Sequence, residues 1–103
     1  MRFLILAAAA LVALPALPFS SAYAQDAASR NLAAGCAICH GTEGRAVTKD
    51  VIQLAGLPKE HIVTQMKAFR DGKRPATVMH QIAKGYNDQQ IDSLAAWFAA
   101  QKR

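Results

Sequence analysis

The sequence is poor in cysteine: it has two cysteines among its 103 residues. A disulfide between Cys36 and Cys39 would close a very short loop, and the stabilisation that a cross-link provides grows with loop length. A structural zinc site needs four ligands at spread positions, and the sequence has no second pair of cysteines or histidines at zinc-finger spacing. The two thiols therefore favour a use other than a structural disulfide or a zinc site.

The sequence also lacks an alternating strand pattern, an internal repeat and a stripe of basic side chains. Without a preceding strand, the C-x-x-C pair has no βαβ setting of the kind that surrounds a thioredoxin-type redox disulfide. The 12 Lys and Arg residues exceed the 7 Asp and Glu residues, but they are scattered, so no nucleic-acid-binding footprint is indicated. The fold class is therefore predicted to be all-α, and a docking patch for an acidic protein partner stays open.

The first residues have the order of a secretory signal peptide. Arg2 gives a positive start, an apolar run extends from Phe3 to Leu14, and Ala22-Tyr23-Ala24 forms an A-x-A cleavage site. The alternative is a membrane anchor, but the apolar run is shorter than the roughly 20 residues of a span, and Pro15 and Pro18 interrupt it. We predict that residues 1–24 are removed on export.

Cleavage would leave one small domain, residues 25–103, in the periplasm and without a membrane span. Domains of this size bury a modest fraction of their surface, and their cores often need an additional staple such as a metal or a cross-link. A bound group that adds apolar contacts is therefore expected.

A histidine follows the second cysteine directly, in the order Cys36-Ala37-Ile38-Cys39-His40. In C-x-x-C-H, the two thiols can add to the two vinyl groups of one porphyrin, and the imidazole then lies under the iron. The motif is the attachment signature of c-type haem and is far more specific than a lone C-x-x-C. We predict one covalent haem c, with Cys36 and Cys39 as thioethers and His40 as the proximal iron ligand.

Four side chains farther along the chain could supply a sixth iron ligand: His61, Met66, Met79 and His80. Met66 lies on the apolar stripe of a predicted helix and is most simply a core residue, whereas His61 is expected on the surface. Met79 and His80 are neighbours in a short predicted helix, so their side chains diverge by about 100°. Met79 falls on the apolar side, and His/Met ligation is typical of small cytochromes. Met79 is thus the predicted distal ligand, and His80 is the alternative.

Capping residues and apolar spacing predict four helices. They cover Asp26 to Cys36, Pro58 to Gly72, a short segment that ends near Gly85, and Asn87 to Lys102. Residues 41–57 are predicted to form a loop because glycines punctuate them. The first and last helices are expected to pack across each other.

The C-x-x-C-H motif, Met79 and the C-terminal stretch "LAAWF" together resemble a class I cytochrome c over nearly all of residues 25–103. The stretches "CHGTEG", "LAGLP", "MKAFRDGKRPATVMHQIAKGY" and "AKGYNDQQID" are similar to the cytochrome c4 and c553 group, and more so to the cytochrome subunit of flavocytochrome c sulfide dehydrogenase. The resemblance implies a small class I fold, in which the terminal helices cross around a covalently bound haem. It also implies thioethers at Cys36 and Cys39 and iron ligation by His40 and Met79.

One segment departs from that pattern. Related sequences usually carry a proline a few residues before "LAG", where a backbone carbonyl accepts the second N–H of the proximal histidine. Here the segment reads Asp50-Val51-Ile52-Gln53-Leu54, without proline. Ile52 still offers its carbonyl, so the hydrogen bond is expected in a less rigid loop.

The resemblance implies a monohaem carrier of single electrons that is not an enzyme on its own. In the favoured reading, a FAD-containing flavoprotein subunit oxidises sulfide, and this chain accepts the electrons and passes them to a downstream redox acceptor. The alternative is a freely diffusible c553/c4-like carrier that serves a terminal oxidase or another acceptor. A sensor that uses His80 or an open sixth site is a more remote third reading.

Overall fold

The computed structural model describes residues 21–103, and for residues 21–25 it describes the backbone alone. The elements in this range are α1 (Ser21–Ala34), α2 (Ala37–His40), the 3-10 turn η1 (Thr42–Gly44), α3 (Lys59–Arg70), α4 (Met79–Ala83) and α5 (Asp88–Ala99). No strand occurs among these residues, which confirms the all-α prediction.

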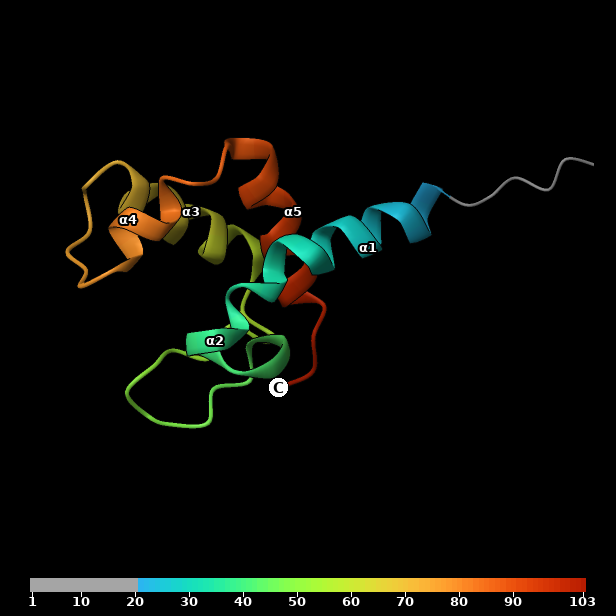
Figure 1. Cartoon of the computed structure of the whole chain (residues 1–103), viewed down its shortest axis with the longest axis horizontal. Helices are drawn as coiled ribbons and strands as arrows, with labels where there is room; N and C mark the ends of the chain where they lie inside the picture. Colours follow the sequence, from blue (N-terminus) through green and yellow to red (C-terminus); the bar gives the residue numbers. More distant parts are fainter. Residues whose placement is uncertain (1–20) are drawn as a thin grey trace, which may run out of the picture.

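Helix α5 forms the centre of the fold. It packs against both α1 and α3, and α4 packs against α3 (Figure 1). The side chains of Ile91, Leu94 and Phe98 on α5 are at most 2% exposed. The rings of Trp97 and Phe98 meet edge to face, with their centroids 5.2 Å apart. Trp97 is therefore part of the core, and the predicted contact between the first and last helices is confirmed.

The sequence specifies the start of α5 closely. Asn87 is the N-cap: its side chain accepts a hydrogen bond from the backbone N–H of Gln90 at 2.8 Å, and the Gln90 side chain accepts one from the Asn87 backbone at 3.0 Å. This reciprocal capping box satisfies two N–H groups that a helix otherwise leaves unpaired. The helix ends at Ala99, earlier than the predicted end at Lys102.

Helix α3 begins directly after Pro58 and buries Ile62 and Met66 on its apolar face. Its polar face is tied to α5, because Lys59 pairs with Asp92 and Arg70 pairs with Asp88 at 2.7 Å. These pairs are partly to largely exposed to solvent and contribute little to stability individually. The buried stripe is therefore what holds α3 in place.

Helix α1 begins at Ser21, earlier than the predicted start at Asp26. Its contact with the rest of the molecule lies near its C-terminal end, where Ala33 is buried. Of the predicted signal peptide, residues 1–20 lie outside the described residues, so cleavage after Ala24 stays a prediction. None of the helices within residues 21–103 combines the length and apolar character that a bilayer crossing requires.

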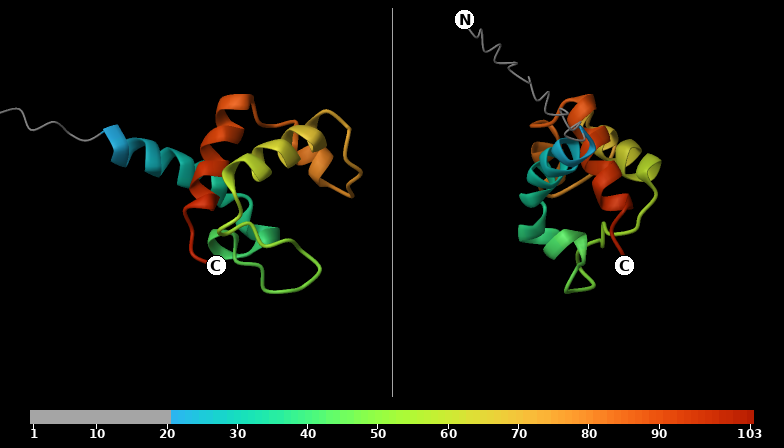
Figure 2. Two further views of the ribbon diagram at one scale, coloured as in Figure 1. Left: turned by 180° about the vertical axis from the view of Figure 1, so that it is seen from behind. Right: turned by 90° about the vertical axis from the view of Figure 1, so that its right-hand side faces the viewer.

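The segment between η1 and α3 is a loop that is closed at its base. The carbonyl of Gly44 accepts hydrogen bonds from the backbone N–H groups of Leu54 and Ala55 at 2.9 and 3.1 Å. The loop is also tied to the end of the chain, since the N–H of Gly56 donates to the carbonyl of Phe98 at 2.9 Å. Figure 2 shows the loop projecting beside α2. Its position is thus set by α5 and not only by its own turns.

Gly44 is the tightest point of this arrangement. It has a φ of +78°, and a Cβ atom built there would lie 2.8 Å from Cδ1 of Phe98 and 2.9 Å from the nitrogen of Ala55. A residue with a side chain is strained at positive φ, and here it would also collide with the core. The glycine therefore allows the loop to pack directly on α5.

Candidate functional site

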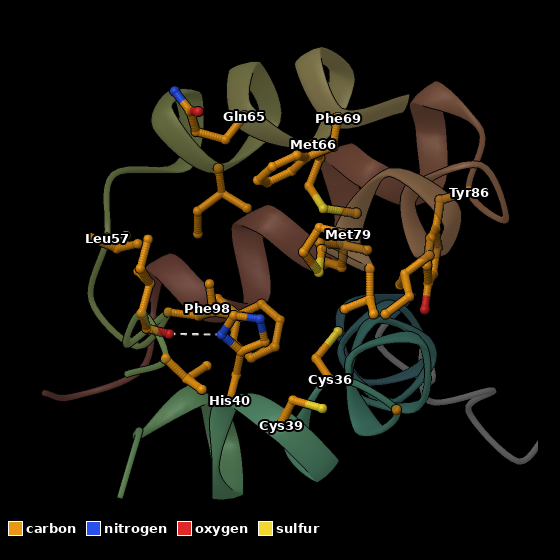
Figure 3. A pocket seen from close by; sticks show the side chains of 18 of the residues that line it. Cys36, Cys39, His40, Leu57, Gln65, Met66, Phe69, Met79, Tyr86 and Phe98 are labelled. Atoms are coloured by element: carbon orange, nitrogen blue, oxygen red, sulfur yellow. Dashed lines mark hydrogen bonds between the residues drawn. The ribbon is translucent and has the colours of Figure 1, made fainter. Parts of the chain in front are cut away.

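A cavity of about 600 Å³ lies between α2, the loop before α3, and the inner faces of α3, α4 and α5 (Figure 3). This volume is within the roughly 300–1,000 Å³ of small-molecule and cofactor sites. Its walls are largely apolar; the side chains that form them include Leu54, Leu57, Ile62, Met66, Phe69, Ile82, Leu94 and Phe98. The cavity thus suits a large, flat and mostly apolar group.

The short helix α2 brings both thiols and the imidazole to one side of this cavity. Its first turn is closed by the bond from the N–H of His40 to the carbonyl of Cys36 at 2.8 Å. Cys36, Cys39 and His40 all line the cavity. Both cysteines are free thiols, and burial raises the pKa of the Cys36 thiol above its ordinary value. Sequence reasoning treated this stretch as a motif without predicting its helical turn.

The imidazole of His40 is held in a fixed orientation. Its Nδ1–H donates to the carbonyl of Ile52 at 2.7 Å (Figure 3). The expected hydrogen bond is therefore present although the segment has no proline. Because Nδ1 carries the proton in this arrangement, the lone pair of Nε2 is free to bind a metal ion, and the hydrogen bond makes that nitrogen a stronger ligand.

Met79 faces the same cavity from the first residue of α4, on the side away from His40 (Figure 3). His80 is not among the residues that line the cavity, and its Nδ1 is buried without a hydrogen-bond partner among the described residues. Met66 also lines the cavity, from α3, but it is 7% exposed and is packed in the core. The geometry places Met79 rather than His80 opposite the imidazole.

A polar edge of the cavity was not predicted. His61 and Gln65 line it from α3, and Arg74 lines it from the segment after α3. His61 is exposed, as the sequence analysis expected, and lies at the rim of the cavity as well. The signal was present in the sequence, because His61, Gln65 and Phe69 recur at intervals of four residues and so share one face of a helix. Asp50 lines the cavity as well, from the loop.

The residues present fit a covalent haem. Two free thiols sit beside an imidazole with an available Nε2, a thioether lies across the cavity, and apolar walls surround the space between them. Among residues 21–103, no three side chains of the His, Cys, Asp and Glu types are grouped to hold a metal ion. The zinc alternative therefore lacks a ligand set in this range.

No family model matches the chain, but curated relatives do. It is 36% identical over 76 residues to cytochrome c4 of Pseudomonas aeruginosa, across 74% of this chain and 38% of that protein. It is 37% identical over 67 residues to the cytochrome subunit of sulfide dehydrogenase of Chlorobaculum tepidum, across 65% of this chain and 60% of that protein. The chain thus spans less than two thirds of the length of these two relatives.

A third relative is matched over most of its own length. The chain is 33% identical over 70 residues to cytochrome c-554(548) of Halomonas halodenitrificans, and this match covers 65% of this chain and 84% of that protein. These matches agree with the helical fold and with the two cysteines that face the cavity. The chain belongs to the class I c-type cytochromes, whose cofactor is covalently attached haem c.

Proposed function

We propose that this chain carries single electrons on one haem c, which Cys36 and Cys39 attach and which His40 and Met79 ligate. The observation that supports this most directly is that two free thiols, an oriented imidazole and a thioether converge on one cavity. His40 and Met79 would hold the haem iron, which would supply the one-electron chemistry, and this ligand pair would favour the ferrous state.

Residues of the chain orient the proximal ligand and shield the floor of the cavity from water. The hydrogen bond to Ile52 keeps the Nε2 of His40 directed toward the cavity, so little reorientation accompanies ligand binding. The apolar side chains of Leu94 and Phe98 exclude water from the cavity floor, since both are nearly fully buried. A site whose ligand is held in place and whose floor excludes water changes little between oxidation states, which suits electron transfer.

We further propose that the chain is exported by residues 1–24 and works in the periplasm as the electron-accepting subunit of a sulfide-oxidising, FAD-containing flavoprotein. It would pass the electrons to a downstream redox acceptor and would not be a catalyst alone. The stretch "RPATVMHQIAKGY" and the sulfide dehydrogenase relative support this role. The relatives named cytochrome c4 and c-554(548) support the alternative, a diffusible electron carrier.

A native periplasmic extract distinguishes the flavoprotein subunit from the diffusible carrier. It is fractionated by size while haem absorbance and flavin fluorescence are followed together, and sulfide is then added to the haem fraction. Co-elution of flavin with haem, followed by rapid haem reduction, supports the flavoprotein partnership. Haem that elutes alone and is not reduced by catalytic amounts of sulfide establishes the diffusible carrier instead.

Covalent attachment is tested separately in a host that attaches haem c. The wild-type chain should keep its haem on denaturing gels, whereas the double variant Cys36→Ser/Cys39→Ser should lose it. A haem stain that persists in the double variant would refute the attachment sites.

A further inference from the structure

Arg74 stands out among the charged groups of the cavity. Among residues 21–103, it contributes the one lysine or arginine side chain to the cavity lining. Two other arginines are paired with carboxylates, Arg45 with Glu43 and Arg70 with Asp71 and Asp88, whereas Arg30 and Arg103, which are unpaired within residues 21–103, do not line the cavity. No such pair involves Arg74 in the described part of the chain. A part-buried guanidinium without a carboxylate partner is costly to desolvate, unless a bound group supplies the anion.

The guanidinium is nevertheless held in place by two side chains of α3. Its carbon lies 4.7 Å from the centroid of the Phe69 ring, which is the geometry of a cation–π contact. Nη1 donates a hydrogen bond to Oε1 of Gln65. An arginine fork has five N–H donors, and side chains of residues 21–103 accept only this one, so the remaining donors are available to a further acceptor.

We propose that Arg74 binds a propionate carboxylate of the haem and that Gln65 and Phe69 position its guanidinium for this contact. The inference rests on the proposed function, because it requires haem in the cavity. A planar guanidinium matches a carboxylate in a two-pronged arrangement, and charge-assisted hydrogen bonds of this kind are about twice as strong as neutral ones.

The orientation of the haem follows from its attachment. The vinyl groups and the propionates lie at opposite edges of the porphyrin, so thioethers at Cys36 and Cys39 direct the propionates to the far side of the cavity. Gln65, the hydrogen-bond partner of Arg74, lies on α3 across the cavity from both cysteines (Figure 3). The covalent bonds therefore deliver carboxylates, rather than any other part of the haem, to the polar edge of the cavity.

The second charged residue of the lining favours the same orientation. Asp50 projects from the loop that carries Ile52 and is a carboxylate itself. Asp50 is exposed, so salt screens its repulsion of a propionate, whereas the part-buried Arg74 attracts one with less screening. His61, one turn before Gln65 on α3, provides a further ring N–H at the polar edge.

The test uses the full-length haem protein labelled with ¹³C at the propionate carboxyl carbons. The label is introduced by growth on 5-aminolevulinate labelled at its carboxyl carbon. Redox-induced infrared difference spectra then isolate the propionate bands through their isotope shift. Arg74→Met should move these bands, and Gln65→Leu should move them in the same direction by a smaller amount because the charge remains but its position is lost.

Lys73→Met is the matched control. It removes the same charge one residue away, from an exposed side chain that does not line the cavity, and it should leave the labelled bands in place. Loss of Arg74 should also shift the ferric–ferrous equilibrium about ten-fold toward ferric iron, which is about 59 mV for a one-electron couple. The Lys73 variant should shift it less than two-fold. Arg74→Lys, which keeps the charge without the fork, should give an intermediate band position.

Labelled bands of Arg74→Met that coincide with those of the wild type would overturn the proposal. This includes the case in which the variant weakens binding of a redox partner, because Arg74 would then serve a carboxylate of that partner. Failure of the proposed function is distinguishable, since a wild-type chain without covalent haem would give no labelled bands at all.

Discussion

Replacing Gly44 by alanine should destabilise the protein more than the same change at Gly72. Both glycines have positive φ, +78° and +72°, and an alanine in the left-handed region costs about 1–2 kcal/mol. At Gly72 nothing lies within 4 Å of the added Cβ, whereas at Gly44 it would lie 2.8 Å from Phe98 and 2.9 Å from the backbone of Ala55. Overpacking of a core costs about 1–3 kcal/mol. We therefore expect a loss of about 1–2 kcal/mol for Gly72→Ala and about 2–5 kcal/mol for Gly44→Ala.

The comparison is made by urea unfolding of the oxidised haem protein, followed by the fluorescence of Trp97, which the haem quenches in the folded state. The difference between the two variants isolates the steric contribution, because both share the backbone strain and the effect of alanine on the unfolded chain. For a domain of this size, each kcal/mol corresponds to about 4–8 °C in Tm. Equal losses at the two positions would refute the argument that the loop is packed directly on Phe98.

Three further predictions concern the distal ligand, the α5 cap and the exposed ion pairs. Met79→Ala should abolish the low-spin ferric spectrum while Met66→Ala keeps it, and the reverse pattern would exchange their roles. Asn87→Ala removes the capping box and should cost about 1 kcal/mol of unfolding free energy; an unchanged urea midpoint would show that the cap contributes nothing. Arg70 and Lys67 lower the pKa of Asp88 through hydrogen bonds and charge. The Asp88 carboxylate therefore contributes fully to the stability of the fold above the ordinary carboxyl pKa of about 3.9. This stabilisation is lost as pH falls through the lower pKa of the folded state. Asp88→Asn should therefore reduce the Tm at pH 7 and change it little at pH 2, and an equal reduction at both would exclude a charge effect.

The sequence predicted the helices wherever local signals were strong. Asn87 is a preferred N-cap residue, so the start of α5 followed from it, and the structure adds Gln90 as its partner in the capping box. The apolar stripe of Ile62 and Met66 likewise identified α3 and its buried face. Helix α2 was missed because a single turn has little stability of its own and depends on its surroundings. Helix boundaries differed by a few residues, because helix ends fray and depend on tertiary contacts.

The candidate site was predictable to the extent that its residues are neighbours in sequence. Cys36, Cys39 and His40 form one motif, and the position of Met79 followed from the polarity of its short helix. The edge that contains Gln65 and Arg74 depends on how α3 and the segment after it face the cavity, which involves contacts between distant parts of the chain. The contact between Gly44 and Phe98 was invisible for the same reason.

The tie between the loop and the end of the chain has a practical consequence for attaching this protein to a surface. Two hydrogen bonds fasten the last residues of the chain to the loop: the N–H of Gly56 donates to the carbonyl of Phe98, and Nε of Arg45 donates to the carbonyl of Lys102 at 2.9 Å. The same loop contains Ile52, whose carbonyl accepts the hydrogen bond from His40. An affinity tag or electrode linker at the C-terminus would pull on that loop and so on the imidazole. The start of α1 points away from the other helices (Figures 1 and 2). Immobilisation through that end leaves the electronic environment of the haem undisturbed.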